Sequence, residues 1–478
     1  MPHSTSQAPL RTQLPIDFVI VGGGLAGLSC ALALRRVGHR VTVLERGQRG
    51  AIRGEGGLRL PPNVSKIFFQ WGLREALEKA SHTSHTIWFS IYESGERLGE
   101  QVWSQEVLKE TRGVFLVTTH AELHDFLHEA ATAAGADIRY GAAVSEVDTE
   151  TRIVQLSSGE SLVGDVIVGA DGEFGICRTA VVGQKTPGTV TGLAMYDTLI
   201  SRKHLPDGPL DKVRAENGSI VAFGDNRAII GYPVHGGEDF AIQLYGPDDA
   251  QEGNYGDEPS VDVSQIASTS QPRLREVLKY ARKATRVTVR DHSDLEDWVD
   301  DEGRLILVGE AAHPFPPGTI QATAMAVEDG AVLAKLFAHL SEARQIESFL
   351  YAFQELRQER TRSVRASEFG NAFFMAMPEC DVSRGRDAMM RQLGEAGLNV
   401  LEGGDGEASG AWDQVRTIFG YDCEDEADDW WVHWGLLRER ALDGRGCEAP
   451  VSAFAGFSMH VSEKAATASE SGESDRVL

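Results

Sequence analysis

Cysteines are scarce in this sequence, and long apolar stretches are absent. The 478 residues include only 5 cysteines and no Cys-x-x-Cys pair, which argues against a disulfide scaffold or a zinc ribbon and favours a reducing compartment. No stretch approaches the roughly 18 apolar residues that a membrane-spanning helix needs. Residues 1–14 lack the apolar core of a secretory signal, so we expect a cytoplasmic protein without membrane contacts.

Basic residues are also under-represented. The chain has 46 lysines and arginines against 71 aspartates and glutamates, which gives a formal net charge of −25. This surplus of negative charge argues against a nucleic-acid partner, because a phosphate backbone needs a basic face, and against docking on anionic lipid. With 42% hydrophobic residues, the composition is that of a large globular protein rather than a disordered chain.

The first informative motif lies in a strand–helix–strand pattern near the N-terminus. Residues 16–21 form an apolar run typical of a buried strand, residues 28–37 have helical composition, and residues 40–45 predict a second strand. The turn between the first strand and the helix reads GGGLAG. A glycine-rich turn in this position indicates a dinucleotide-binding βαβ unit.

The glycines of this turn predict a phosphate-binding site. They permit a tight turn and close backbone approach to a pyrophosphate, whose charges the free amides of a helix N-terminus favour. Glu45 ends the second strand, where its carboxylate could accept hydrogen bonds from a ribose diol and would repel a 2′-phosphate. The pattern leaves both NAD and FAD open as ligands. The predicted site residues are Gly22, Gly24, Leu25, Ala26, Gly27 and Glu45.

Two later segments distinguish between these ligands. Residues 169–178 read GADGEFGICR, and residues 309–317 read GEAAHPFPP and lead to a predicted helix that begins QATAMAVEDG at residue 321. Together with the first glycine turn, they resemble the single-component flavoprotein aromatic hydroxylases of the salicylate hydroxylase and para-hydroxybenzoate hydroxylase type. The resemblance covers about residues 15–435 and implies bound FAD.

The resemblance also implies how the FAD contacts are distributed along the chain. The first glycine turn and Glu45 would hold the adenosine half, the segment at Asp171 would lie near the pyrophosphate, and the segment at Gly309 would meet the ribityl chain. The helix that begins at Gln321 would direct its N-terminus at the pyrimidine side of the flavin. Beyond the first glycine turn and Glu45, the implied contacts are Arg46, His120, Asp171, Gly172, Gly309, Glu310, Gln321, Ala322 and Thr323.

The sequence departs from the pattern of this family at four places. Glu310 stands where an aspartate is usual, residues 320–322 read Ile-Gln-Ala in place of Gly-Gln-Gly, and His120 stands where the helix usually begins with an arginine. Asp197 stands where many relatives have an arginine that ionises or anchors an acidic phenol. Because Asp197 reverses this charge, we expect a neutral or amine-bearing substrate if its side chain lines the pocket.

The resemblance implies an FAD-dependent monooxygenase that uses NADPH or NADH and O2 to hydroxylate an aromatic or other electron-rich ring. In this family a C4a-hydroperoxyflavin delivers the oxygen, while the protein excludes water and raises the electron density of the substrate. Candidate catalytic bases are Tyr232, His235 and Asp197. We expect a small aromatic, indole or polyketide-like substrate. An FAD-dependent dehydrogenase or reductase without oxygen insertion and a non-catalytic flavin-binding protein are the alternatives.

Three histidines recur at four-residue spacing on one face of a predicted helix, namely His120, His124 and His128. Zinc-binding helices have a similar spacing, but an aspartate follows His124 where the zinc motif needs a glutamate, and the sequence offers no evident third ligand. We therefore expect a surface stripe of histidines and no metal site.

The order of the elements predicts an α/β protein with a discontinuous, Rossmann-like FAD-binding domain, an inserted β-rich substrate domain and a helical C-terminal region. The acidic, glycine-rich stretch at residues 246–260 is predicted to be a surface loop. A monomer and a homodimer are both compatible with the sequence. The predicted ranges are a flexible tail at 1–14, the FAD-binding domain at 15–80, 112–184 and 290–365, the substrate domain at 81–111 and 185–289, the helical region at 366–462 and a disordered tail at 463–478.

Overall fold

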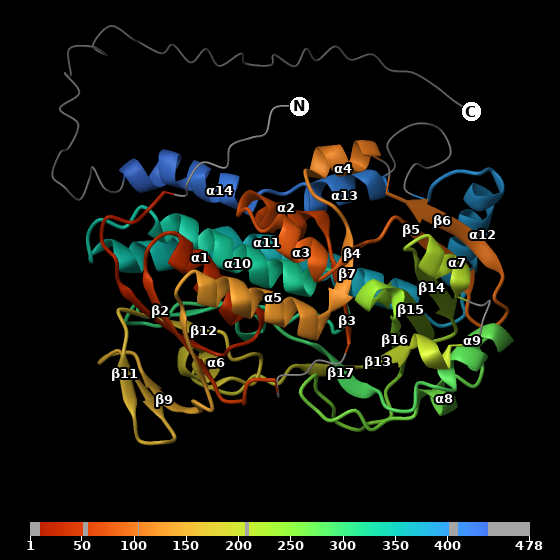
Figure 1. Ribbon diagram of the computed structural model, residues 1–478, viewed down its shortest axis with the longest axis horizontal. Helices are drawn as coiled ribbons and strands as arrows, with labels where there is room; N and C mark the ends of the chain where they lie inside the picture. The colour runs from red at the N-terminus through yellow and green to blue at the C-terminus, as the bar shows by residue number, and fades with distance from the viewer. Residues whose placement is uncertain (1–9, 51–55, 104, 206–209, 401–409, 438–478) are drawn as a thin grey trace, which may run out of the picture. The chain divides into compact units, whose positions relative to one another are not determined.

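The computed structural model describes residues 10–50, 56–103, 105–205, 210–400 and 410–437 (Figure 1). The chain divides into a compact unit that ends at Asp428 and a second unit that begins at Asp429. The described part of the second unit ends in a short π-helical segment, Trp431–Gly435. The predicted tail at 463–478 lies outside the described residues. The elements discussed below belong to the first unit, except that α14 ends two residues inside the second.

A parallel sheet forms the centre of the FAD-type half of this unit. Its strands are β1 (Asp17–Val21), β2 (Arg40–Glu45), β8 (Asp137–Tyr140), β12 (Val166–Gly169) and β18 (Leu305–Leu307). Their spatial order is β18-β12-β1-β2-β8, with every pairing parallel. The apolar runs of β1, β12 and β18 are buried almost throughout, as a parallel sheet covered on both faces requires.

The carboxyl ends of these strands bring the predicted cofactor motifs to one edge of the sheet. The glycine turn follows β1, Glu45 ends β2, and the GADG segment follows β12. Backbone hydrogen bonds fix this edge, because the amide of Gly22 donates to the Leu44 carbonyl at 2.9 Å and the amide of Ala170 donates to the Val21 carbonyl at 2.8 Å. Segments that are more than a hundred residues apart in sequence therefore meet here.

An antiparallel-rich sheet of seven strands forms the other half, in the order β17-β13-β16-β15-β14-β5-β6. Two separate parts of the chain build it, because β5 and β6 come from residues before 103: β5 pairs in parallel with β14, and β6 pairs antiparallel with β5. This arrangement confirms the predicted fold class. Its strands are β5 (Thr86–Ile91), β6 (Arg97–Val102), β13 (Thr189–Ser201), β14 (Ser219–Gly224), β15 (Arg227–Val234), β16 (Asp239–Pro247) and β17 (Thr285–Asp291).

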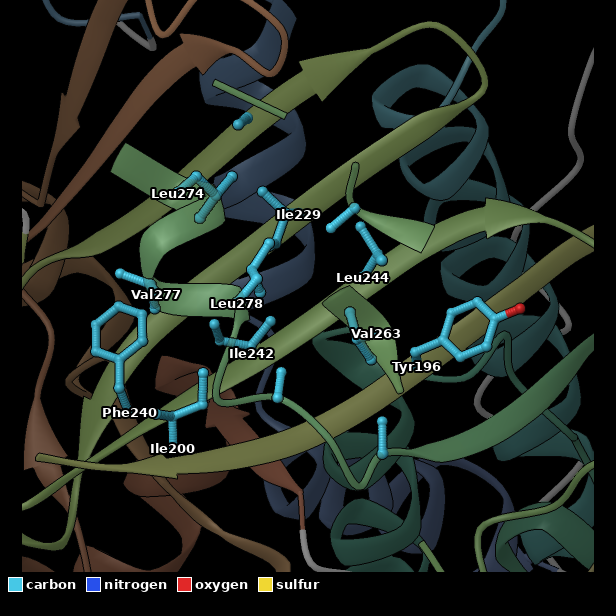
Figure 2. Packing of buried hydrophobic residues seen from close by; sticks show 14 of the residues in the cluster. Tyr196, Ile200, Ile229, Phe240, Ile242, Leu244, Val263, Leu274, Val277 and Leu278 are labelled. Atoms are coloured by element: carbon cyan, nitrogen blue, oxygen red, sulfur yellow. The ribbon is translucent and has the colours of Figure 1, made fainter. Parts of the chain in front are cut away.

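The two faces of this sheet have different environments, because successive side chains of a strand point to opposite faces. Figure 2 shows one face, where Tyr196, Ile242 and Leu244 pack against Val263 of α8 and the apolar residues of α9. The neighbouring residue Asp197 therefore points to the opposite face, which packs against strand β3. The two helices are α8 (Val263–Ile266) and α9 (Pro272–Leu278), and β3 is Gly57–Leu60.

Long helices connect the two halves. Helix α10 (Gln321–Phe337) packs against α1 (Leu25–Arg36) and against α11 (Gln345–Met375), and α11 continues to β14 of the seven-stranded sheet (Figure 1). The remaining helices are α2 (Pro62–Gln70), α3 (Arg74–Lys79), α4 (Gln105–Thr111), α5 (His120–Ala133), α6 (Ile176–Val182), α7 (Asp211–Ala215), α12 (Asp381–Glu395), α13 (Gly410–Phe419) and α14 (Cys423–Trp430). Two small sheets contain β3, β4 (His82–Thr83) and β7 (Leu116–Thr119), and β9 (Val144–Asp148), β10 (Ile153–Leu156) and β11 (Ser161–Val163).

The first residues of the described chain are bound to the rest of the fold. Residues 12–14 were expected in a flexible tail, but Thr12 donates to the Val37 carbonyl at 2.9 Å and Leu14 donates to the Leu340 carbonyl at 3.1 Å. These residues are therefore part of the fold.

Within the described ranges, each helix is either too short or too polar to cross a bilayer.

A buried histidine makes the fold sensitive to acid. His39 accepts a hydrogen bond from the Ile16 amide at Nδ1 (3.3 Å), and its Nε2 lies 3.0 Å from the Phe337 carbonyl, so the neutral ring with a proton on Nε2 satisfies both contacts. Desolvation by burial is the main cause that lowers the pKa of His39 from 6.5 to about 4.

We expect the free energy of unfolding to fall as the pH drops from about 6.5 towards 4, because the unfolded state then binds a proton that the folded state excludes. His39 contributes at most about 1.4 kcal/mol per pH unit in this window and nothing above it. Urea unfolding at several pH values measures this slope. A His39→Gln variant should show a shallower slope, and an equal slope would contradict the assignment.

Candidate active site

The glycine turn after β1 contains two glycines that the packing of the protein requires and one that it does not. A Cβ on Gly22, whose φ is +109°, would lie 2.3 Å from the Ala170 carbonyl oxygen. A Cβ on Gly27 would lie 2.0 Å from the Gly22 carbonyl oxygen. A Cβ on Gly24 would meet no atom within 4 Å. Packing therefore explains Gly22 and Gly27, whereas the space above Gly24 is available to a ligand.

The start of helix α1 offers hydrogen-bond donors to that space. Gly24 caps the helix without a side-chain hydrogen bond, and the first helical bond runs from the Leu28 amide to the Gly24 carbonyl. The amides of residues 25–27 therefore precede the first intrahelical bond and favour an anion. Gly172, with a φ of +82°, has equally open space, and the buried Oδ1 of Asp171 has no partner among the described residues. These features fit the pyrophosphate of a dinucleotide.

Glu45 lies beside the glycine turn as predicted. Its Oε2 accepts a hydrogen bond from the Gly23 amide at 2.8 Å, and its Oε1 accepts one from the Gly47 amide at 2.6 Å. These bonds fix the carboxylate, and each oxygen keeps a lone pair for a ribose hydroxyl. The adjacent Arg46 is exposed.

The histidine stripe on α5 is buried, so the prediction of a surface stripe was wrong. His124 and His128 are 5% and 8% exposed, because this face of α5 packs towards α1. His124 Nε2 lies 3.0 Å from the Gly23 carbonyl oxygen. The buried Nδ1 of His120 has no partner within the described chain, and desolvation followed by His124 lowers the pKa of His120 to about 4. A neutral imidazole therefore stands at the first position of α5.

The described residues contain no group of three side chains that could hold a metal ion. The start of α5 is fixed by a capping box, in which Thr119 Oγ1 accepts from the Glu122 amide at 3.1 Å and Glu122 Oε2 accepts from the Thr119 amide at 3.3 Å. This box holds His120 at the first position of the helix, next to the glycine turn.

The segment after β18 lies at the same edge of the parallel sheet, because β18 runs parallel to β12. Gly309 has a φ of +59°, and a Cβ on it would lie 2.6 Å from the Cβ of Ala26, so only glycine fits. The side chain of Glu310 reaches solvent, yet desolvation and the carboxylate of Glu173 raise its pKa to about 7. The first turn of α10 follows nearby in the chain with Gln321, Ala322 and Thr323.

A buried network of charges holds this segment in place. Arg357 is fully buried, and its Nε and Nη1 donate to Asp329 and Glu328, each at 2.8 Å. Asp329 Oδ2 also accepts from the Gly309 amide at 2.8 Å, and Glu328 Oε1 accepts from Asn63 Nδ2 at 2.7 Å. Helices α2, α10 and α11 are thereby tied to the Gly309 segment.

Asp197 lies on the face of the seven-stranded sheet that packs against β3. It is 6% exposed, and its Oδ1 has no hydrogen-bond partner among the described residues. A Cβ on Gly56 would lie 1.6 Å from Asp197 Oδ2, so the chain before β3 must be glycine to pass the carboxylate. Desolvation raises the pKa of Asp197 to about 7, against hydrogen bonds from the Gly57 amide and Gln243.

Arg59 of β3 is the cation of this cluster, and the sequence interpretation missed it. Its Nη2 donates to the Gly318 carbonyl and lies 3.4 Å from Gln243 Oε1. Its charge acts on both Asp197 and Tyr232. The only sequence signal is a single arginine between two leucines, in the sequence GLRLPPN at residues 57–63.

The predicted bases do not all lie together. The hydroxyl of Tyr232 is buried near β3, where a Cβ on Gly57 would lie 2.6 Å from it, and burial raises the pKa of this phenol far above its usual value. Tyr232 is therefore a hydrogen-bond donor at neutral pH. His235 follows β15 and instead contacts Asp239 at 2.7 Å and Glu122 at 3.6 Å.

Comparisons with known proteins agree with this site. A family model described as FAD binding domain matches residues 16–367. The FAD-dependent monooxygenase OpS4 of Beauveria bassiana (strain ARSEF 2860) is 27% identical over 79% of this chain and 89% of its own length. The 3-hydroxybenzoate 6-hydroxylase of Klebsiella oxytoca is 27% identical over 67% of this chain and 79% of its own length.

Solved structures show the same fold. The structure of CtdE in complex with FAD and substrate 4 has a TM-score of 0.72 at 21% identity and covers 89% of this chain and 100% of its own. A salicylate hydroxylase substrate complex has a TM-score of 0.67 at 18% identity and covers 87% of this chain and 97% of its own. The family match spans more than half of the chain, and its relatives carry monooxygenase and hydroxylase names. The protein therefore belongs to the FAD binding domain family, within which it is a single-component FAD-dependent monooxygenase.

Proposed function

We propose that this monooxygenase uses NAD(P)H and O2 to hydroxylate a small aromatic substrate that is neutral or carries an amine. The carrying observation is the buried Asp197 carboxylate, whose Oδ1 has no partner among the described residues. Bound FAD would supply the transfer of electrons from NAD(P)H to O2 and the delivery of one oxygen atom to the ring. The 3-hydroxybenzoate 6-hydroxylase relative supports an aromatic substrate.

Several residues would hold FAD in this proposal. The free amides of α1 and the open space at Gly24 suit the pyrophosphate, and Glu45 suits the ribose. Gly309 and the first turn of α10 suit the ribityl chain and the ring. The predicted ranges 15–80, 112–184 and 290–365 would then serve the cofactor, and 81–111 and 185–289 would serve the substrate.

The balance of charge in the Asp197 cluster favours an amine over a benzoate. Arg59 is the cation of this cluster, and its charge acts on the carboxyl groups of Asp197 and Glu368. Burial raises the pKa of both carboxyl groups. A carboxylate substrate would add a further negative charge to a site where solvation cannot offset it. An N–H group would instead donate to Asp197 Oδ1.

Asp197 is also suited to accept a proton from the substrate. With its pKa near 7, Asp197 is ionised in part of the molecules at neutral pH, and the ionised carboxylate can take a phenolic proton. Tyr232 would donate a hydrogen bond to the substrate, because its buried phenol stays protonated. His235 would lie outside this chemistry and would anchor Glu122 at the start of α5.

Replacing Asp197 with asparagine should lower kcat/KM for an aminophenol about tenfold, because a charge-assisted hydrogen bond of roughly 1.5 kcal/mol is lost. Asp197→Arg should shift the preference from aminophenols to hydroxybenzoates. Substrate-stimulated NAD(P)H oxidation together with mass spectrometry of the product measures both effects. FAD content should stay unchanged, because Asp197 lies outside the cofactor edge.

Asp239→Asn is the matched control, since Asp239 lies in the same sheet but pairs with His235. This variant should keep the substrate preference of the wild type. Equal rates for Asp197→Asn and the wild type, or a wild-type preference for hydroxybenzoates, would contradict the proposal.

A further inference from the structure

Residues 248–257, here called the strap, leave β16 and run along the edge strand β17. The strap makes up most of the predicted surface loop at 246–260, and most of its residues are exposed as predicted, while its backbone is fixed to β17. The Thr288 amide donates to the Gly253 carbonyl at 3.0 Å, and the Gly253 amide donates to Thr288 Oγ1 at 3.2 Å. A Cβ on Gly253 would lie 2.3 Å from the Arg286 carbonyl oxygen, so the two backbones are in direct contact.

Two arginines of β17 hold the acidic residues of the strap. The side chain of Arg286 is buried and pairs with Asp248 and with Asp249, the latter at 2.7 Å. Arg290 pairs with Glu252 near the surface. These charge-assisted contacts explain why the strap is acidic and why it follows the sheet instead of extending into solvent.

The strap carries Tyr255 to the substrate cluster. The Tyr255 hydroxyl accepts a hydrogen bond from the Gly318 amide at 2.6 Å, while the Gly318 carbonyl accepts from Arg59. Burial of this hydroxyl end raises the pKa of Tyr255, and the charges that act on it include those of Asp197 and Glu310. Yet 36% of the Tyr255 surface is exposed. The ring therefore spans the boundary between solvent and the Asp197 cluster.

Other tyrosines show that loop anchoring alone does not explain this placement. Tyr245 donates to the neighbouring Pro317 carbonyl at 2.6 Å and is completely buried in the sheet. It already ties the 317–318 turn to β16. Tyr255 contributes a second bond to the same turn, although Tyr255 itself stays partly exposed to solvent.

We propose that Tyr255 is a substrate-contacting gate residue, carried by the strap, whose ring covers the Asp197 cluster and stacks on an aromatic ligand. This inference rests on the proposed function, because it assigns the strap to the same substrate site. An aromatic ligand that reaches Asp197 from this side displaces or stacks on the Tyr255 ring. When the ring is in place, it keeps water from the cluster.

The test compares the FAD-loaded wild type with Tyr255→Ala, Tyr255→Phe and the control Tyr280→Ala, since Tyr280 is 49% exposed and stacks on His204 elsewhere. Iodide quenching of the fluorescence of bound FAD reports solvent access without turnover. We expect the quenching constant to rise about threefold or more for Tyr255→Ala and to stay near the wild-type value for Tyr255→Phe and Tyr280→Ala.

The second readout is turnover with 3-aminophenol as the probe substrate. Its KM should rise several-fold in Tyr255→Ala, and the share of consumed NAD(P)H that appears as H2O2 should increase, while Tyr280→Ala changes neither. Wild-type quenching and KM in Tyr255→Ala would overturn the gate. If instead the Asp197 variants show no amine preference while Tyr255→Ala still raises iodide access, the gate stands and the amine assignment fails.

Discussion

A Gly24→Ala variant should fold normally and bind FAD about a hundredfold more weakly. The added methyl group meets no protein atom within 4 Å, so the apoprotein has no steric reason to lose stability. It would instead occupy the space in front of the free amides of α1. Moving a pyrophosphate away from two charge-assisted hydrogen bonds costs roughly 3 kcal/mol, which is about a hundredfold in the dissociation constant. Titration of the apoprotein with FAD measures the loss, and thermal unfolding of the apoprotein tests the fold.

Gly27→Ala is the informative contrast, because its methyl group would lie 2.0 Å from the Gly22 carbonyl oxygen. This variant should lose stability even without FAD. Wild-type FAD affinity in Gly24→Ala would show that the pyrophosphate does not lie above this turn. Loss of the fold in Gly24→Ala would show that the turn packs against protein that the open space does not reveal.

An Arg357→Met variant should lose roughly 3–5 kcal/mol of the free energy of unfolding, because it leaves two buried carboxylates without their shared partner. Desolvation by burial opposes ionisation of both. Nevertheless, His313 and Arg357 lower the pKa of Asp329 to about 2, and Arg360 and Arg357 keep the pKa of Glu328 below its usual value. Removing Arg357 therefore forces these carboxylates either to take up protons or to remain buried and poorly compensated.

Arg362→Met is the matched control on the same helix. Arg362 is half exposed and pairs with Asp294 and Glu359 at the surface, so its loss should cost at most about 1 kcal/mol. Urea unfolding of both variants at neutral pH measures the difference. A loss in Arg357→Met no larger than that in Arg362→Met would mean that the buried network contributes specificity and not stability.

The meeting of the predicted cofactor motifs at one edge of the parallel sheet could be predicted, because the signal of each motif is local. The glycine turn and Glu45 lie within one βαβ unit, and their spacing follows from the geometry of a strand, a turn and a helix. The later segments at Asp171 and Gly309 follow strands of the same sheet, so their carboxyl ends meet at one edge.

The substrate half could be predicted only in part, because it depends on register between distant strands. Asp197 was identified, but its neighbours are set by pairing with Gln243 in β16 and by the approach of Arg59 from β3. Nothing in the sequence near Arg59 indicates that it lies opposite residue 197. Tyr255 was missed for a related reason, since the acidic stretch is solvent-exposed as predicted, but nothing in its sequence shows that the buried Arg286 fixes it to the sheet.

The histidine stripe shows the limit of helical periodicity. The four-residue spacing correctly placed His124 and His128 on one face of α5. Periodicity does not say which face is covered, and the turn before α1 supplies the polar partner that makes a buried histidine acceptable, namely the Gly23 carbonyl.

The strands of the seven-stranded sheet come from separate parts of the chain, and this has a consequence for how the protein folds during synthesis and where it can be cut. Strands β5 and β6 emerge from the ribosome about a hundred residues before β14, the strand with which β5 pairs. The parallel sheet is likewise incomplete until β18 has been synthesised, and β18 follows every strand of the other sheet in the chain. Neither half is a contiguous segment of chain: the seven-stranded sheet is complete only after β17, which ends at Asp291, and the parallel sheet only after β18, which ends at Leu307. Because the two sheets are interleaved along the chain, a gene truncated at any point before β17 would leave both sheets incomplete and with exposed edges. Truncation would therefore not yield a separately folding cofactor or substrate domain.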